Sequence, residues 1–403
     1  MDKYNKFRIN QEELYKLITF IFSFATTMVF TINILYQIQV AGLLPWQLVI
    51  VGTCLELTCF IFEIPTGVIA DRFSRKLSVI LGFALIGTGF MLEGSFPYFI
   101  TIATAQIVWG IGFTCVSGAL DAWVLDETGK EELYISGSKF ATVGQFLGIA
   151  TSIALAQLQL NLPIVVGGIL LIILAFILVF SMTEKSYKKT MDTGDENYFI
   201  NTVKVILSTV KTSYVLAMLF AITFLFGLYS EGFDRLWGNY ILDIDTFKNI
   251  NGTYLFGGVA AIISIIGFFT FSKIEEKVEN ISIKNINKLL ILLCSIIASA
   301  LLFMSITEKA YALIFLVIII NLSRSIIEPF ETIWFNKLIT DSSNRATVLS
   351  LKGQIGALGQ IGSGLIMGAF SILLPLKFIF ALSAIIFSPV ILIYKHLNGS
   401  YKE

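Results

Sequence analysis

The stretch Gly67-Val68-Ile69-Ala70-Asp71-Arg72-Phe73-Ser74-Arg75-Lys76 decides the fold, because its charges separate two long apolar runs, residues 46–70 and 77–94. A helix needs roughly 20 apolar residues to cross a bilayer, and each run is close to that length. Short loops rich in Arg and Lys are typical of the cytoplasmic side of a membrane. The sequence therefore predicts two membrane-spanning helices joined by a short cytoplasmic loop.

Composition extends this prediction to the whole chain. The 403 residues are 56% hydrophobic and 14% charged, with a mean hydropathy of +0.82, whereas soluble proteins carry about 25% charged residues. The formal net charge is zero, which gives no bias toward nucleic acid. The four cysteines form no C-x-x-C pair and there is a single histidine, so we expect no metal site and no metal cofactor.

Twelve apolar runs are candidate membrane helices, and the longest polar interval divides them six and six. They are expected near residues 14–40, 46–70, 77–94, 97–122, 137–160, 162–182, 213–242, 250–272, 286–306, 309–335, 345–371 and 373–396. The predicted organisation is an N-terminal six-helix bundle over 1–182, a cytoplasmic linker over 183–212 and a C-terminal six-helix bundle over 213–403. The fold class is an all-α integral membrane protein.

Two further expectations concern the cytoplasmic side. Lys and Arg collect in the N-terminal segment and in alternate loops, which predicts that both termini are cytoplasmic. Within the linker, apolar side chains recur near helical spacing from Tyr198 to Val210, which predicts an amphipathic helix lying on the membrane surface. A plain linker with one helical turn is the alternative.

The opening stretch resembles the loop 2–3 signature of the major facilitator superfamily, G-x-x-x-D-(R/K)-x-G-R-(R/K). Gly67, Asp71, Arg72, Arg75 and Lys76 match it, and Ser74 stands where the family has glycine. The resemblance implies two pseudo-symmetric six-helix bundles around a central cavity that opens alternately to either side. It also implies a monomer that embeds in the bilayer of a bacterial cell membrane and carries a small-molecule substrate.

The same resemblance gives the loop a mechanical role. Asp71 is expected to lie against the N-terminus of the helix over 345–371, where the helix dipole favours an anion. Arg75 is expected to contact Asp121 or Asp126. Together these contacts would hold the two halves together when the transporter faces outward, and we call them the loop latch.

Inserting a charged residue near the bilayer centre costs about 2.5–3.5 kcal/mol of free energy. A functional or structural role is therefore expected for each charged residue inside a span. Glu56 and Glu63 are seven residues apart and share one helix face. A desolvated carboxyl group can bind and release a proton during transport, which makes both of them proton-coupling candidates, with Glu56 as the first choice. The alternative is a structural carboxyl group that is hydrogen-bonded to a neighbouring helix.

A second charged face lies on the helix over 309–335. Arg324, Glu328 and Glu331 follow at spacings of four and three, and Pro329 is expected to kink the helix beside them. The expected partner of Arg324 is Glu328, or Glu56 across the cavity. The pair would either exchange partners during transport or fix the helix packing permanently.

The helix over 213–242 carries a third cluster, in which Glu231 and Arg235 can pair at four-residue spacing with Asp234 between them. It is predicted to form an outer gate or a cation-binding rim, or else an ordinary capped helix end. Asp234 and Glu328 join the proton candidates. Polar side chains that could line a cavity or form interhelical hydrogen bonds are Asn33, Gln37, Gln106 and Asn321.

The branch of the family is predicted from two segments, Ser230–Trp237 and Glu63-Ile-Pro-Thr-Gly67, which resemble a drug-efflux-like branch. That branch also tends to carry G-x-x-x-G-P-x-x-G-G, whereas here Gly144 and Gly148 are followed by Ile149. We expect proton-coupled efflux of lipophilic or amphiphilic, drug-like compounds, with the proton as the coupling ion. The alternatives are a porter for a defined sugar, peptide or lipid, and an intramembrane enzyme or receptor. The sequence has no phosphate loop and no catalytic triad, so we expect no enzymatic activity.

Overall fold

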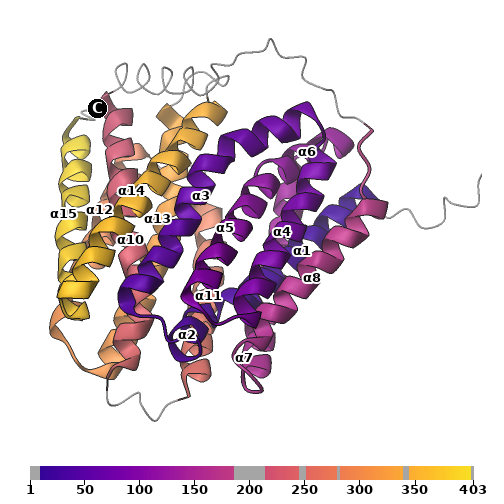
Figure 1. The fold of residues 1–403 in the computed structure, drawn as a ribbon. Coiled ribbons are helices and arrows are strands. Elements are labelled where there is room, and N and C mark those ends of the chain that lie inside the picture. Colours follow the sequence, from indigo (N-terminus) through magenta and orange to yellow (C-terminus); the bar gives the residue numbers. More distant parts are fainter. Residues whose placement is uncertain (1–9, 186–213, 245–250, 279–281, 339–344, 401–403) are drawn as a thin grey trace, which may run out of the picture. The chain divides into compact units, whose positions relative to one another are not determined.

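The computed structural model describes residues 10–185, 214–244, 251–278, 282–338 and 345–400, and all the regular elements within these ranges are α-helices (Figure 1). In the first part of the chain they are α1 (Gln11–Phe30), α2 (Asn33–Gln39), α3 (Pro45–Arg72), α4 (Arg75–Ser95), α5 (Phe99–Val116), α6 (Ala119–Thr128), α7 (Glu132–Ala156) and α8 (Leu162–Ser181). In the second part they are α10 (Tyr214–Leu242), α11 (Gly252–Val278), α12 (Ile283–Ile306), α13 (Ala310–Leu338), α14 (Arg345–Leu373) and α15 (Leu376–Ser400).

Twelve segments of these helices are long and apolar enough to cross a membrane, which confirms the predicted number within the described ranges. Most of their bounds lie within a few residues of the predicted ones. The predicted amphipathic helix of the linker falls largely in 186–213, outside the described residues, and stays a prediction.

Two of the spans are broken, which the apolar runs alone did not indicate. The first consists of α1 and α2, separated at Thr31 and Ile32, and the fourth consists of α5 and α6, separated at Ser117 and Gly118. Gly118 has φ +71°, a conformation that side-chain-bearing residues rarely adopt. The carbonyl groups of Thr114 and Cys115, just before the second break, accept hydrogen bonds from Thr66 at 3.0 Å and Ser78 at 2.7 Å.

The contacts divide the chain into two compact units. Unit 1 contains Met1–Leu43 and Leu57–Gly194, and unit 2 contains Leu44–Glu56 and Asp195–Glu403. The division therefore falls within α3, whereas the prediction assigned this whole helix to the N-terminal bundle. Small residues explain the difference, because Gly52 lies directly against Glu231 and Arg235 of α10, and Gly364 of α14 lies against Thr53.

Glycines also set the closest helix pairs inside each unit. In unit 1, a Cβ on Gly144 of α7 would lie 2.6 Å from the carbonyl oxygen of Phe20 on α1. In unit 2, Gly227 of α10 and Gly359 of α14 each contact the backbone of the other helix. The glycine-rich α14 therefore packs tightly against α10, beside the charged residues of that helix.

Candidate functional site

Unit 2 contains a cavity of about 720 Å³, within the size range of small-molecule sites. Its wall comes from α10, α13 and α14 and combines charged, polar and small residues. The lining residues are Thr223, Phe226, Gly227, Ser230, Asn321, Arg324, Ser325, Ile327, Glu328, Glu331, Thr332, Lys352, Gly353, Gly356 and Gln360. Arg324, Glu328 and Glu331 all line it, as their predicted common face requires.

Arg324 pairs with Asp234 of α10, so both predicted partners, Glu328 and Glu56, are wrong. Its Nη1 and Nη2 donate to the two carboxylate oxygens of Asp234 at 2.5 and 2.8 Å. This two-point geometry is stronger and more directional than a contact between neighbours on one helix. The pair connects α13 to α10 at one part of the cavity wall.

A second ion pair connects α13 to α14. Lys352 Nζ lies 3.4 Å from Oε2 of Glu331, and the hydroxyl of Tyr394 on α15 donates to Oε1 of Glu331 at 2.6 Å. Glu331 is only 6% exposed, so a partner is required to offset the cost of removing its charge from water. Lys352 is also 5.2 Å from the ring centre of Phe335.

Glu328 differs from both carboxylates beside it. It lies between Arg324 and Glu331 on α13, its side chain is exposed, and it forms no ion pair with any described residue. Both cations of the cavity wall, Arg324 and Lys352, already have carboxylate partners. Glu328 is therefore the carboxylate of the wall that has no cationic partner among the described residues. It is therefore the carboxylate best placed to meet a proton or a substrate.

The predicted pair of Glu231 and Arg235 is present, with Arg235 Nε donating to Glu231 Oε1 at 2.8 Å. Glu231 is buried, the Arg235 side chain is 15% exposed, and the pair packs on the backbone of α3 at Gly52. Glu56, one turn further along α3, is under the electrostatic influence of Glu231, Arg235 and Asp234. These contacts favour a packed ion pair over the predicted outer rim.

The polar side chains predicted to line a cavity behave in two ways. Asn321 does line the cavity of unit 2. Asn33, Gln37 and Gln106 are buried in unit 1 instead, where Gln37 and Gln106 donate to the two carboxylate oxygens of Glu93 at 2.7 and 2.9 Å. The structure thus supports the alternative of interhelical hydrogen bonds for Gln37 and Gln106, whereas Asn33 accepts a hydrogen bond from Gln37 on its own helix at 3.3 Å.

Glu63 belongs to unit 1 and lies at the break between α5 and α6. The hydroxyl of Ser117 donates to its Oε1 at 3.3 Å, while the neighbouring Thr66 donates to the carbonyl of Thr114. Glu63 therefore contacts the one point of the fourth span where the helix is interrupted.

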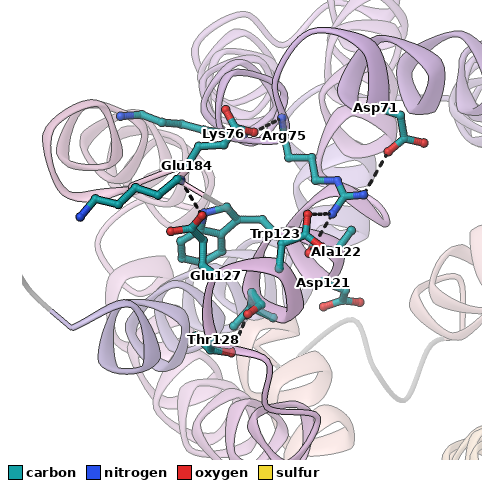
Figure 2. A network of polar contacts seen from close by, with 12 residues as sticks. Asp71, Arg75, Lys76, Asp121, Ala122, Trp123, Glu127, Thr128 and Glu184 are labelled. Carbon is teal, nitrogen blue, oxygen red and sulfur yellow. Dashed lines mark hydrogen bonds and ion pairs between the residues drawn. The ribbon is translucent and has the colours of Figure 1, made fainter. Parts of the chain in front are cut away.

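Figure 2 shows three of the loop residues that match the family signature, Asp71, Arg75 and Lys76. Arg75 forms an ion pair with Asp126 and donates to the carbonyl of Ala122 at 3.0 Å, and it lies 3.5 Å from Asp71. The predicted contact with Asp126 is present, whereas Asp121 accepts a hydrogen bond from Tyr15 instead. The expected contact of Asp71 with α14 joins the two units and stays a prediction, as does the mechanical role of the loop latch.

Ser74, the departure from the signature, caps α4. Its hydroxyl oxygen accepts from the amide of Leu77 at 3.0 Å and donates to Glu184 at 2.5 Å. The same carboxylate accepts from the amides of Arg75 and Lys76 at 2.6 and 3.2 Å. A carboxylate at a helix N-terminus meets both the free amide groups and the positive end of the dipole.

Four residues that pair with the predicted site residues were not predicted from the sequence: Glu93, Lys352, Tyr394 and Glu184. Glu93 and Lys352 carried a usable signal, because each is a charge inside a predicted span. Tyr394 and Glu184 carried none, because a tyrosine near a helix end and a glutamate in a polar interval are both ordinary. Their roles depend on which helix lies opposite.

Comparison with known proteins agrees with this architecture. Residues 16–367 match the model of the Major Facilitator Superfamily, so the chain belongs to this family of membrane transporters. A Bacillus subtilis (strain 168) protein described as "Uncharacterized MFS-type transporter YxaM" is 25% identical over 366 residues, 86% of each chain. The protein is thus a multi-pass secondary transporter.

Solved structures share the fold at low sequence identity. The nucleoside transporter NupG has a TM-score of 0.76 at 13% identity, over 98% of this chain and all of its own. A POT family transporter in complex with 5-aminolevulinic acid has a TM-score of 0.73 at 14% identity, over 98% and 97%. A bacterial homologue of the lysosomal transporter Spinster has 0.70 at 12%, over 97% and 96%. At these identities the likeness shows the fold alone.

Proposed function

We propose that this transporter exports lipophilic or amphiphilic compounds from a bacterial cell by proton-coupled antiport. The observation that carries the proposal is the exposed carboxylate of Glu328 in a cavity large enough for a drug-sized molecule. A substrate and a proton that compete for one carboxylate are exchanged across the membrane as the cavity opens alternately to either side. The binding of one then requires the release of the other.

The composition of the wall supports an amphiphilic substrate. Phe226 and Ile327 offer apolar surface, and Gly353 and Gly356 leave room on α14 between the side chains of Lys352 and Gln360. Arg324 and Lys352 are held by Asp234 and Glu331, so an uncharged or cationic group meets less resistance there than an anion. Proton exchange at Glu56 and Glu63 stays part of the proposal, but Glu328 replaces Glu56 as the first choice because it is exposed and lines the cavity.

A porter for a defined metabolite is the second candidate. Asn321, Ser325, Thr332 and Gln360 line the same cavity and could form directional hydrogen bonds with a sugar, a peptide or a lipid headgroup. NupG and the POT family proteins, whose names indicate nucleosides and peptides, have the same fold. Competition separates the two candidates, because an efflux pump accepts many unrelated compounds and a porter accepts few.

The test begins with a thermal-shift screen of the purified protein against drugs, sugars, peptides and lipids at two pH values. A compound that stabilises the protein is then added to proteoliposomes that enclose a pH-sensitive dye. Substrate-driven proton flux is expected from the unaltered protein. In Glu328→Gln the flux should fall at least about tenfold, which corresponds to 1.4 kcal/mol, and should lose its dependence on pH.

The conservative variant Glu328→Asp should retain part of the flux, and Glu308→Gln, which removes an exposed carboxylate at the end of α12, should retain all of it. Substrate transport in Glu328→Gln with an unaltered pH profile would refute the assigned proton site. Substrate transport without proton flux in the unaltered protein would refute proton coupling.

A further inference from the structure

Unit 1 has a groove between α1 and α7 whose chemistry is unrelated to the cavity of unit 2. Its volume is about 530 Å³, and it is lined by four apolar and three charged side chains. Leu17 and Phe20 of α1 face Phe140 and Val143 of α7, and Glu13, Lys16 and Lys139 complete the lining.

Along both helices the charged residues come first and the apolar residues follow, which matches the polar headgroup and the apolar chain of an amphiphile. The two helices run in parallel, since Gly137 contacts Tyr15, and Gly144 contacts the backbone of Phe20 further along both. Lys16 and Lys139 therefore lie at the same level, near the starts of α1 and α7. The apolar residues follow them in the direction of the membrane interior.

The charges of the groove leave one positive charge in excess. Lys16 is paired with Glu13 at 2.7 Å, and that carboxylate is 59% exposed. Lys139 is exposed and forms no ion pair with any residue that the structure describes. A negatively charged headgroup in this position would pair directly with Lys139. It would also pair with Lys16 by replacing the exposed carboxylate of Glu13.

We propose that this groove binds an anionic phospholipid of the cytoplasmic leaflet. The phosphate lies between Lys16 and Lys139, and one acyl chain lies along Phe20, Phe140 and Val143. Basic pockets between membrane helices on the cytoplasmic side are suited to acidic headgroups. The leaflet follows from the predicted orientation of the chain, and the proposal holds whether or not the exported compounds are drug-like.

The test uses the full-length protein purified in a neutral detergent, to which phosphatidylglycerol or phosphatidylcholine is added. Phosphatidylglycerol is expected to raise the melting temperature more than phosphatidylcholine does, and to remain bound in native mass spectrometry. The double variant Lys16→Gln, Lys139→Gln should lose most of this difference between the two lipids. The variant Lys16→Arg, Lys139→Arg should keep it.

Two controls define the site. Lys130→Gln removes a lysine from the loop between α6 and α7 that pairs with Glu12 at 2.8 Å, outside the groove, and it should respond as the unaltered protein does. Val143→Trp fills the apolar part and should weaken lipid retention with both lysines in place. Melting temperatures in phosphatidylcholine show whether each variant is folded.

Three results would overturn the proposal. The first is equal stabilisation by the two lipids in the unaltered protein, as expected if another part of the chain covers the groove. The second is an equal loss in Lys130→Gln, which would indicate unspecific attraction. The third is full stabilisation by glycerol 3-phosphate alone, which would define a site for a free anion without an acyl chain.

Discussion

Single residues in this transporter act through small, specific contacts between helices. Gly52 shows this most directly, because the space that its missing side chain leaves is filled by the Glu231–Arg235 ion pair. Glu231 is buried and the Arg235 side chain is only 15% exposed, so the pair has little solvent to move into if that space is taken. A glycine in a helix interior normally weakens the helix. The contact with Glu231 and Arg235 explains why Gly52 nevertheless lies inside α3.

We expect Gly52→Ala to lower the free energy of unfolding by about 1–3 kcal/mol, because the added methyl group overlaps Glu231 and Arg235. Gly258→Ala is the matched control, since Gly258 is helical and has open space where a Cβ would be. There the free energy should stay equal or rise by about 0.5–1 kcal/mol, because alanine favours a helix. Denaturant titrations in detergent measure both. Equal effects of the two variants would contradict the assigned contact.

At the scale of helices, the main feature is the interruption of two membrane spans, between α1 and α2 and between α5 and α6. The break between α5 and α6 separates a membrane-crossing part from a ten-residue helix that carries Asp121 and Asp126. Two carbonyl groups at the end of α5 are satisfied by hydroxyl groups of α3 and α4. The break is therefore a stable feature of unit 1, because its polar groups have partners without water.

The start of α4 offers the sharpest test at this scale. Glu184→Ala removes three hydrogen bonds from the cap of α4, and we expect a loss of about 1–2 kcal/mol of stability, as for a lost N-cap. Ser74→Gly, which restores the glycine of the family signature, removes one of them. The double variant should lose less than the sum of the single losses, by about 0.5–1.5 kcal/mol, because the two side chains share a bond.

Glu131→Ala serves as the control for loss of a carboxylate, since no hydrogen bond connects the Glu131 side chain to α4 within the described residues. It should leave stability unchanged and be additive with Ser74→Gly. Strict additivity of Glu184→Ala and Ser74→Gly would show that the cap does not act as a unit.

At the scale of the molecule, the loop latch is the feature that we expect to affect the transport cycle. Arg75 and Asp126 form a partly exposed pair, and such pairs contribute no more than about 1 kcal/mol to stability. An effect of this pair on transport therefore has to come through the rate of a conformational change. The effect of the Arg75–Asp126 pair on stability can therefore be measured separately from its effect on the transport rate.

We expect Asp126→Asn to leave the melting temperature nearly unchanged and to reduce the maximal rate of substrate-driven proton flux several-fold, with little change in the substrate concentration at half-maximal rate. The substrate is the compound found in the thermal-shift screen. The exchanged pair Arg75→Asp, Asp126→Arg should recover part of the rate. A pure loss of stability, or a rate that stays unaltered in Asp126→Asn, would contradict the latch.

The sequence by itself determined the class of the protein, the twelve apolar spans found among the described residues, and the common face of Arg324, Glu328 and Glu331. These depend on composition and helical periodicity, which are local properties of the chain. Only the tertiary structure decided that Arg324 pairs with Asp234, that Lys352 and Tyr394 hold Glu331, and that Gln37 and Gln106 surround Glu93. Helical spacing states which side chains share a face, but the partner lies on another helix, and packing alone brings the two faces together.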